Sequence, residues 1–189
     1  LLHQQGAATP TQRTDLYEKY VDLLLAREAN KHPKAVKDHK EELLEIIPFL
    51  GWYLHAHTEE SQINGRMSID ELREAMRHFQ RTYGNRESIV DQLFEGVSDR
   101  LWALTSKVDG TYEFEVLSLR EYFAARFLYR NAGEDNADFD STTVLRELLR
   151  RPYWLNTARF YGGNAKGSSL YVLTAGIERE LAQTSAPAS

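Results

Sequence analysis

Histidines near acidic residues are the first side chains in this sequence whose types could support chemistry. His55 and Glu59 lie four residues apart, so a helix would place them on one face, whereas His57 would point in a different direction. Two ligands are too few for a zinc site. His39 and His78 have no better-placed acidic partners. We therefore expect no metal site and interpret these histidines as side chains on solvated helix faces.

A glycine-rich stretch from Gly162 to Ser168 shares only its composition with a phosphate-binding loop. In such a loop the lysine follows the glycine and a strand leads in, but here Lys166 precedes Gly167 and no strand pattern comes before it. A turn between helices over 162–167 explains the stretch. The sequence contains no cysteine, and its serines occur mainly at helix starts and in loops. We find no catalytic triad and expect no enzymatic activity in this chain.

A row of carboxylates recurs every four residues along a helix predicted over 87–98, away from its apolar stripe. The row consists of Glu87, Asp91, Glu95 and Asp99. It would repel DNA phosphates instead of neutralising them. The net charge of −5 also gives no general attraction to nucleic acid or to an anionic membrane. These charges argue against nucleic acid as a partner.

The central feature of the sequence is a strand that passes directly into a helix. Apolar and acidic residues first alternate, which predicts a half-buried strand over 112–117 with Val116 in its core. At Ser118 the period changes, and Glu121, three residues on, completes a capping box that would start a helix. The inward-facing residues of that helix are Leu119, Tyr122, Phe123 and Phe127.

The elements before this strand are predicted to be mostly helical. One helix ends near Asn30, and a second runs over 35–58 with a kink at Pro48. A capping box at Ser68 and Glu71 opens a third helix that is stopped by Tyr83-Gly84-Asn85, and the acidic helix over 87–98 follows. A strand over 101–107 and a primed turn at Asp109-Gly110 complete a hairpin with the strand over 112–117. Three helices and a two-stranded wing predict a winged helix within a mostly α fold.

After Arg130 the pattern predicts an acidic loop and three more helices. The loop covers 131–140, and the helices cover 141–150, 154–161 and 169–181. The Pro, Ala and Ser content of the end of the chain predicts a disordered tail over 183–189.

Three segments resemble, in the same order, parts of the NACHT-type STAND ATPases. These are nucleotide-switched defence and signalling proteins that include animal NLRs and bacterial relatives. A strand ending in an aromatic residue and followed by Ser-Leu-x-Glu-Tyr-Phe-Ala-Ala is similar to the end of the family's winged-helix domain; its residues here are Phe114, Leu117, Ser118, Glu121, Tyr122 and Phe123. The junction that closes the family's helical domain is matched by Pro10, Thr14, Asp15, Leu16 and Tyr17. The stretch from Trp154 to Gly163 resembles the start of the helical region that follows the winged helix.

The resemblance implies a regulatory fragment of a longer ATPase, which also fits a chain that starts at Leu1 instead of Met. Residues 1–34 would end the helical domain, 35–131 would form the winged-helix domain, and 132–182 would form a helical linker region. The partners would be the upstream NTPase domain and the downstream sensor region of the same chain, in a parent able to oligomerise. ATP or ADP with Mg²⁺ would bind to the parent, and no cofactor is expected in this fragment.

One position departs from the family pattern. Two residues before the serine of the motif, the family usually has a histidine that reaches the β-phosphate of bound ADP, and this sequence has Val116. Valine cannot hydrogen-bond a phosphate. Either closure is held differently in this protein, or the register of the match is shifted.

Two functions from other classes stay open at this point: a DNA-binding winged-helix transcription regulator, and a protein-interaction scaffold with no link to a nucleotide. The composition is ordinary for a soluble globular chain, with 42% hydrophobic and 27% charged residues. The lack of cysteine favours a reducing cytoplasmic location. The apolar runs are too short to span a bilayer, so we expect no membrane partner.

Overall fold

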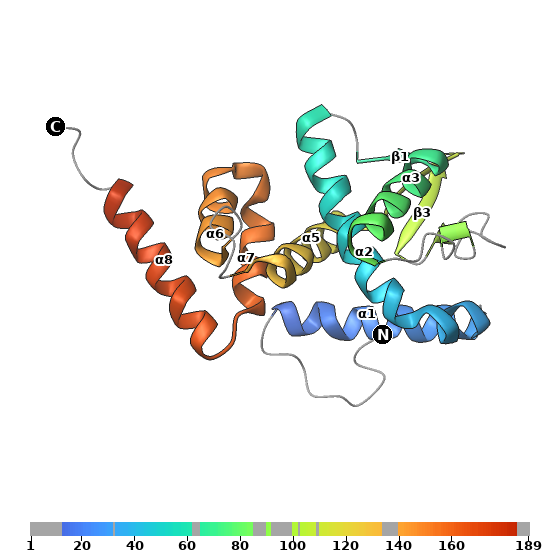
Figure 1. Cartoon of the computed structure of the whole chain (residues 1–189), viewed down its shortest axis with the longest axis horizontal. Helices are drawn as coiled ribbons and strands as arrows, with labels where there is room; N and C mark the ends of the chain where they lie inside the picture. The colour runs from blue at the N-terminus through green and yellow to red at the C-terminus, as the bar shows by residue number, and fades with distance from the viewer. Residues whose placement is uncertain are drawn as a thin grey trace.

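The computed structural model describes residues 13–31, 33–61, 65–84, 90–91, 100–101, 103–108, 110–133 and 140–184. In these ranges the chain is mostly helical, as predicted, with a small antiparallel sheet at one end (Figure 1). The α-helices are α1 (Arg13–Lys31), α2 (Pro33–Ser61), α3 (Ile69–Phe79), α5 (Leu117–Asn131), α6 (Ser141–Arg150), α7 (Leu155–Asn164) and α8 (Ser168–Thr184). Two short turns of other helix types are η2 (Gln80–Gly84) and η3 (Pro152–Trp154).

Several predicted features lie outside the described residues. They are the junction at Pro10, most of the acidic helix over 87–98, most of the loop over 131–140, and the end of the tail beyond Thr184. Two residues of the predicted tail, Gln183 and Thr184, belong to α8.

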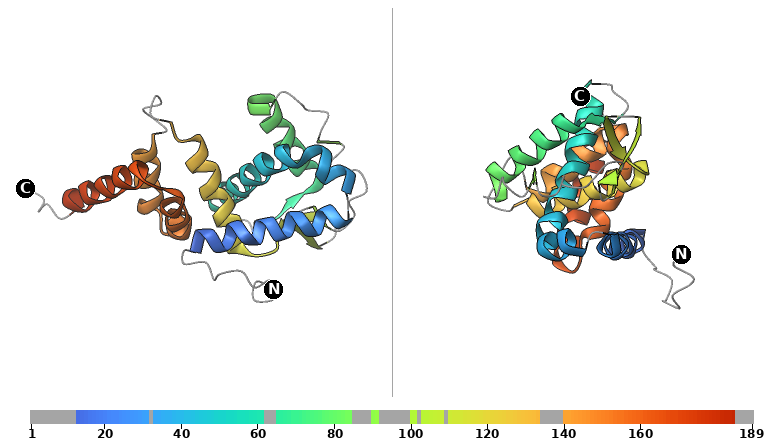
Figure 2. Two further views of the ribbon diagram at one scale, coloured as in Figure 1. Left: turned by 90° about the horizontal axis from the view of Figure 1, so that it is seen from below. Right: turned by 90° about the vertical axis from the view of Figure 1, so that its right-hand side faces the viewer.

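Helix α5 lies at the centre of the molecule and packs against both α2 and α7 (Figure 1). The predicted inward residues of α5, from Leu119 to Phe127, are all buried. The predicted stripe of α2 is buried as well: Leu43, Ile46, Ile47, Leu50 and Leu54. Helix α1 lies alongside this core and also contacts α7, as the two views in Figure 2 show. The apolar periodicity of the sequence therefore identified the core faces correctly.

Helices α2 and α5 approach so closely that a glycine is required between them. A Cβ atom on Gly51 would lie 2.5 Å from Phe123 Cβ and 3.0 Å from the backbone nitrogen of Ala124. Distances this short mean that the α5 backbone must move if a methyl group is added.

We predict that Gly51→Ala lowers the free energy of unfolding by about 1–3 kcal/mol, because it overpacks this helix crossing. Gly162→Ala, in α7, is the matched control, since no atom lies within 4 Å of its added Cβ. That control should stabilise the fold by about 0.5–1 kcal/mol, through helix propensity alone. Urea denaturation of both variants measures their free energies of unfolding. If the two free energies changed by the same amount in the same direction, the close approach of α2 and α5 would be contradicted.

The sheet has four strands where the sequence predicted two. Its order is β1-β4-β3-β2, all antiparallel, with β1 (Met67–Ser68), β2 (Arg100–Leu101), β3 (Leu104–Val108) and β4 (Thr111–Phe114). The predicted hairpin is present, because β3 pairs with β4 across a two-residue connection and Gly110 has φ of 73°. Such a positive φ is what a primed turn requires. The two outer strands have two residues each, too short for an alternating pattern to reveal.

One of the two predicted capping boxes is present, and the other is not. Ser68 caps α3, with its Oγ accepting from the Glu71 amide and the Glu71 carboxylate accepting from the Ser68 amide. At the other site the strand ends at Phe114, Val116 is the N-cap residue of α5, and no side chain caps the helix. The Ser118 box was wrong because both of its side chains have tertiary partners, described below.

Two local predictions differ from the structure in their positions. The kink in α2 is at His39, with φ of −133° and ψ of 22°, and the helix continues through Pro48. The predicted loop over 162–167 is shorter, because α7 continues to Asn164.

Candidate functional site

Three aromatic rings from three distant segments meet beside the start of α5. Tyr17 of α1, Tyr122 of α5 and Phe160 of α7 lie with ring centroids 5.4 Å (Tyr17–Tyr122), 4.8 Å (Tyr17–Phe160) and 5.6 Å (Tyr122–Phe160) apart. These separations suit tilted and edge-to-face packing of aromatic rings. We call these three residues the aromatic triad. Tyr122 is fully buried, and the triad joins α1, α5 and α7.

The hydroxyl groups of the triad have internal partners. Tyr17 donates its hydroxyl proton to Ser118 Oγ at 2.6 Å, which explains why Ser118 does not cap the helix. The Tyr122 hydroxyl accepts from Arg126 Nη1 at 3.3 Å. Burial raises the pKa of the Tyr122 phenol, so this side chain stays neutral and structural.

A groove opens on the surface above the triad. It has a volume of about 320 Å³. Its lining residues are Leu16, Tyr17, Tyr20, Val116, Ser118 and Leu119. We call it the α1–α5 groove, because these residues come from α1 and from the start of α5.

The rim of the α1–α5 groove is apolar and exposed. Val116 is 48% exposed and the adjacent Leu117 is 55% exposed, so the predicted burial of Val116 in a strand was wrong. The strand prediction failed because the chain turns into α5 directly after Phe114. Leu16, on the α1 side, is 37% exposed. Apolar side chains gathered around a groove are typical of a docking surface.

A short chain of polar contacts also joins α1, α5 and α7. Asn156 donates its amide to the Glu121 carboxylate, which is buried, and accepts from Arg13 Nη1 at 2.7 Å. The Arg13 guanidinium also lies over the ring of Phe160, 4.7 Å from its centroid. Glu121 therefore holds α7 against α5, instead of serving as half of a capping box.

Sequence reasoning missed a second buried polar group, around Arg120. This side chain is 7% exposed and donates to Thr58 Oγ1 at 3.2 Å and to the Tyr153 hydroxyl at 2.9 Å. The pKa of its guanidinium is lowered by burial. It fits against Gly65, whose φ of 67° and lack of a Cβ leave room for the guanidinium.

His55 belongs to the same buried group, which overturns its prediction as a solvated side chain. It is fully buried, its ring stacks on Tyr153 with centroids 4.3 Å apart, and its Nε2 lies 3.3 Å from Thr157 Oγ1. Desolvation first, and the Arg120 charge second, lower the pKa of His55 to about 3. Gly51, four residues earlier on the same helix face, was the available signal of a close helix contact.

The remaining predicted site residues are structural. Phe114 is buried at the end of β4, and its ring centroid lies 5.8 Å from that of Phe123. Phe123 also packs next to Tyr122, with centroids 5.4 Å apart. Together they join the sheet to α5.

The lining of the α1–α5 groove is mostly apolar, as is typical of a docking surface. The hydroxyls of Tyr17 and Ser118 are bonded to each other, Tyr20 carries a third hydroxyl, and the other lining side chains are aliphatic. Among the described residues, no three His, Asp or Glu side chains gather as a metal site would require. In the same ranges, no helix combines the length and apolarity needed to cross a membrane.

Comparisons of this chain with protein-family models, with curated proteins and with solved structures found no match.

Proposed function

We propose that this chain is the regulatory part of a NACHT-type STAND ATPase, and that its α1–α5 groove docks against the ATPase core. The observation that carries the proposal is the aromatic triad. Tyr17, Tyr122 and Phe160 each come from a different one of the three segments that resemble the family. Segments that resemble one family in sequence order and also pack together favour a common origin over chance similarity.

The same proposal describes the middle of the chain as a winged-helix domain. Helix α3, the helix predicted over 87–98 and the hairpin of β3 and β4 follow one another in the order that a winged helix has. In this proposal the domain serves packing and switching. The parent protein binds ATP or ADP through residues outside this chain, and a sensed ligand is coupled to oligomerisation.

The charges near the hairpin support packing over DNA binding. Glu113 of β4 forms ion pairs with Arg66 Nε at 2.9 Å and with Lys107 Nζ at 2.8 Å. The carboxylate thus pairs with two cations that a DNA-binding wing would direct at phosphates, and it offsets one of their two positive charges. Side-chain hydrogen bonds from Lys107, and secondarily from Arg66, lower the pKa of Glu113, so it stays charged.

Val116 suggests how the closed state of the switch is held. In the family match it stands where a phosphate-contacting histidine is usual, and here it is an exposed apolar side chain at the rim of the groove. We infer that the closed state is held by apolar docking of Val116, Leu117 and Leu16. Full burial of such a side chain from water contributes about 1.5–3 kcal/mol, and because these three are 37–55% exposed in the chain, docking adds roughly half of that for each.

The first experiment concerns the longer protein that this proposal requires. It is purified and denatured, and the released small molecules are identified by chromatography and mass spectrometry. ADP or ATP is the expected finding. A stable, nucleotide-free protein would favour a scaffold with no nucleotide link, and salt-dependent DNA binding by the chain would favour a transcription regulator.

The docking surface is tested by a substitution in the groove. We predict that Val116→Asp weakens binding of this chain to the separately produced ATPase domain by at least about tenfold, since it places a charge in an apolar contact. Its own stability should rise by about 0.5–2 kcal/mol, because Val116 is the exposed, uncapped N-cap position of α5 and an aspartate there can accept from the first amides of the helix. Weaker binding would therefore not come from unfolding.

The matched control is Leu149→Asp, on α6, where the leucine is 39% exposed and lies outside the groove lining. Calorimetric titration should give unchanged affinity for the control. Equal affinities for both variants and the original chain would reject the α1–α5 groove as the docking site.

A further inference from the structure

An exposed stripe runs along α8, the helix at the C-terminal end of the molecule (Figure 1). Leu170, Ile177 and Leu181 are 50%, 38% and 61% exposed, and Thr174 between them is exposed too. Their spacings of four, three and four residues place them on one face of the helix. This is also the a/d spacing of a coiled-coil seam. We call these four residues the α8 stripe.

A different face of α8 attaches it to the rest of the chain. Leu173 is buried, a Cβ on Gly176 would lie 3.2 Å from Thr142 Cγ2 of α6, and Glu180 pairs with Arg150 at 3.5 Å. With about 100° of rotation per residue, the α8 stripe lies roughly a quarter of a turn around the helix from this face. A partner can therefore cover the stripe while α8 stays packed on α6.

The one polar residue of the α8 stripe does not oppose its burial. The Thr174 hydroxyl donates to the Leu170 carbonyl oxygen at 2.9 Å within the helix. Because this hydroxyl already has a partner, covering it creates no unsatisfied donor. The stripe itself carries no charge, so nothing in it selects a charged partner.

We propose that the α8 stripe binds the same stripe of a second copy of this chain, with the two α8 helices antiparallel. The spacing of four, three and four residues reads the same in both directions. A two-fold axis between positions 175 and 176 therefore places Leu170 opposite the partner's Leu181, and Thr174 opposite the partner's Ile177. Such self-complementarity is what a symmetric dimer interface requires.

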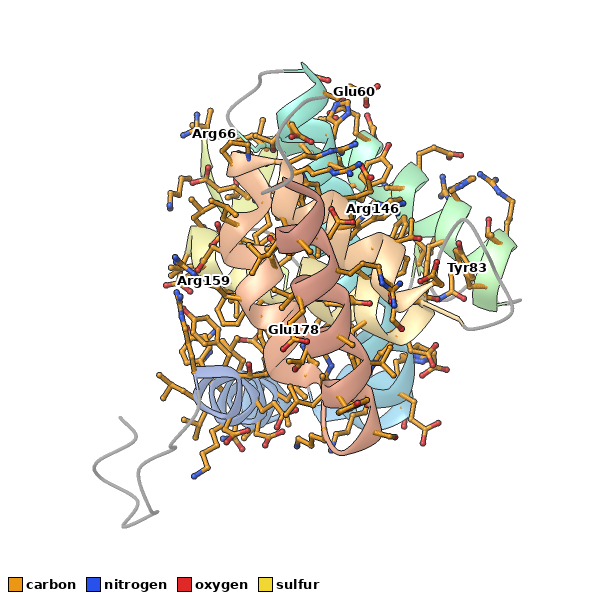
Figure 3. All side chains as sticks on the ribbon, turned by 90° about the vertical axis from the view of Figure 1, so that its left-hand side faces the viewer. Glu60, Arg66, Tyr83, Arg146, Arg159 and Glu178 are labelled. Atoms are coloured by element: carbon orange, nitrogen blue, oxygen red, sulfur yellow. The ribbon has the colours of Figure 1, made fainter. Side chains whose placement is uncertain are left out.

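The flank of the stripe fits the same arrangement. Tyr171 and Glu178 lie on one side of it, and Tyr171 is 79% exposed. In the antiparallel pair Tyr171 lies beside the partner's Glu178, where a phenolic hydroxyl can donate to a carboxylate. Like charges are not brought together. Figure 3 views the molecule from this end, with α8 and Glu178 toward the viewer.

Sedimentation equilibrium of the chain tests this interface. A standard protein interface buries about 1,600 Å², and a pair of single helices buries less. We therefore expect a weak dimer, whose fraction rises with the concentration of the chain. The mass should rise from 21.8 kDa toward twice that value. Ile177→Glu should remain monomeric, because it places two carboxylates in the seam. Val172→Glu, which is 47% exposed in the original chain but off the stripe, should dimerise normally.

Thermal unfolding followed by circular dichroism checks that both variants fold. A chain that stays at 21.8 kDa up to its solubility limit would overturn the proposal. So would an equal loss of dimer in both variants.

Disulfide crosslinking decides the orientation and does not depend on the glutamate variants. The chain has no cysteine, so Leu170→Cys and Leu181→Cys each introduce a single thiol. Within one helix these positions are about 16 Å apart, too far for an internal bridge. A mixture of the two variants should form the mixed disulfide under oxidation. Rapid crosslinking of each variant with itself would indicate parallel helices, and no crosslinking would reject the contact.

Discussion

Replacing Tyr122 with alanine should lower the free energy of unfolding by about 3–5 kcal/mol. The side chain is fully buried and its ring packs against Tyr17, Phe123 and Phe160. Alanine would leave a cavity where α1, α5 and α7 meet. Tyr122→Asp adds the cost of burying a carboxylate in the same place, and we expect that variant not to fold.

The matched control for this prediction is Tyr122→Phe. It keeps the ring and removes only the hydroxyl that accepts from Arg126, so the expected cost is about 1 kcal/mol. Chemical denaturation at neutral pH separates the two effects. If the alanine and phenylalanine variants lost the same stability, the hydroxyl would matter and the packing of the triad would not.

Acidification should destabilise the fold through His55, beginning well above the range in which carboxylates titrate. The pKa of this histidine is 6.5 in its ordinary state and about 3 in the folded chain. Between these values the unfolded chain binds a proton that the folded chain does not, so stability falls as pH falls. The expected loss is about 1.4 kcal/mol for each pH unit below 6.5.

The variant His55→Leu removes this titration. Its free energy of unfolding should therefore change little between about pH 6.5, the ordinary histidine pKa, and about pH 5, which lies above the range in which carboxyl groups titrate. Asp140 and Glu71 have lowered pKa values, caused first by side-chain hydrogen bonds, so they contribute only below that window. His55→Gln is the second variant, in case leucine cannot replace the polar contact with Thr157. Equal slopes for the original chain and a folded variant would show that His55 is not the titrating group.

The sequence by itself determined the elements whose signals are local. The Ser68 capping box needs only Glu71, three residues away, and the turn at Gly110 needs only a residue that tolerates positive φ. The inward faces of α2 and α5 follow from apolar periodicity, because a helix without a buried stripe has little to hold it in the fold. These predictions did not depend on which other segment lies opposite.

The tertiary structure alone decided which polar side chains would be buried and with what. Ser118 bonds to Tyr17, 101 residues away, and His55 lies against Thr157, 102 residues away. A capping box and a solvated histidine were the better local expectations, and both were wrong because a distant partner replaced the local one. The exposure of Val116 was also decided by the structure, because the chain turns into α5 directly after Phe114 instead of continuing as a buried strand. Local patterns carry no information about such contacts, because they form only when the helices pack.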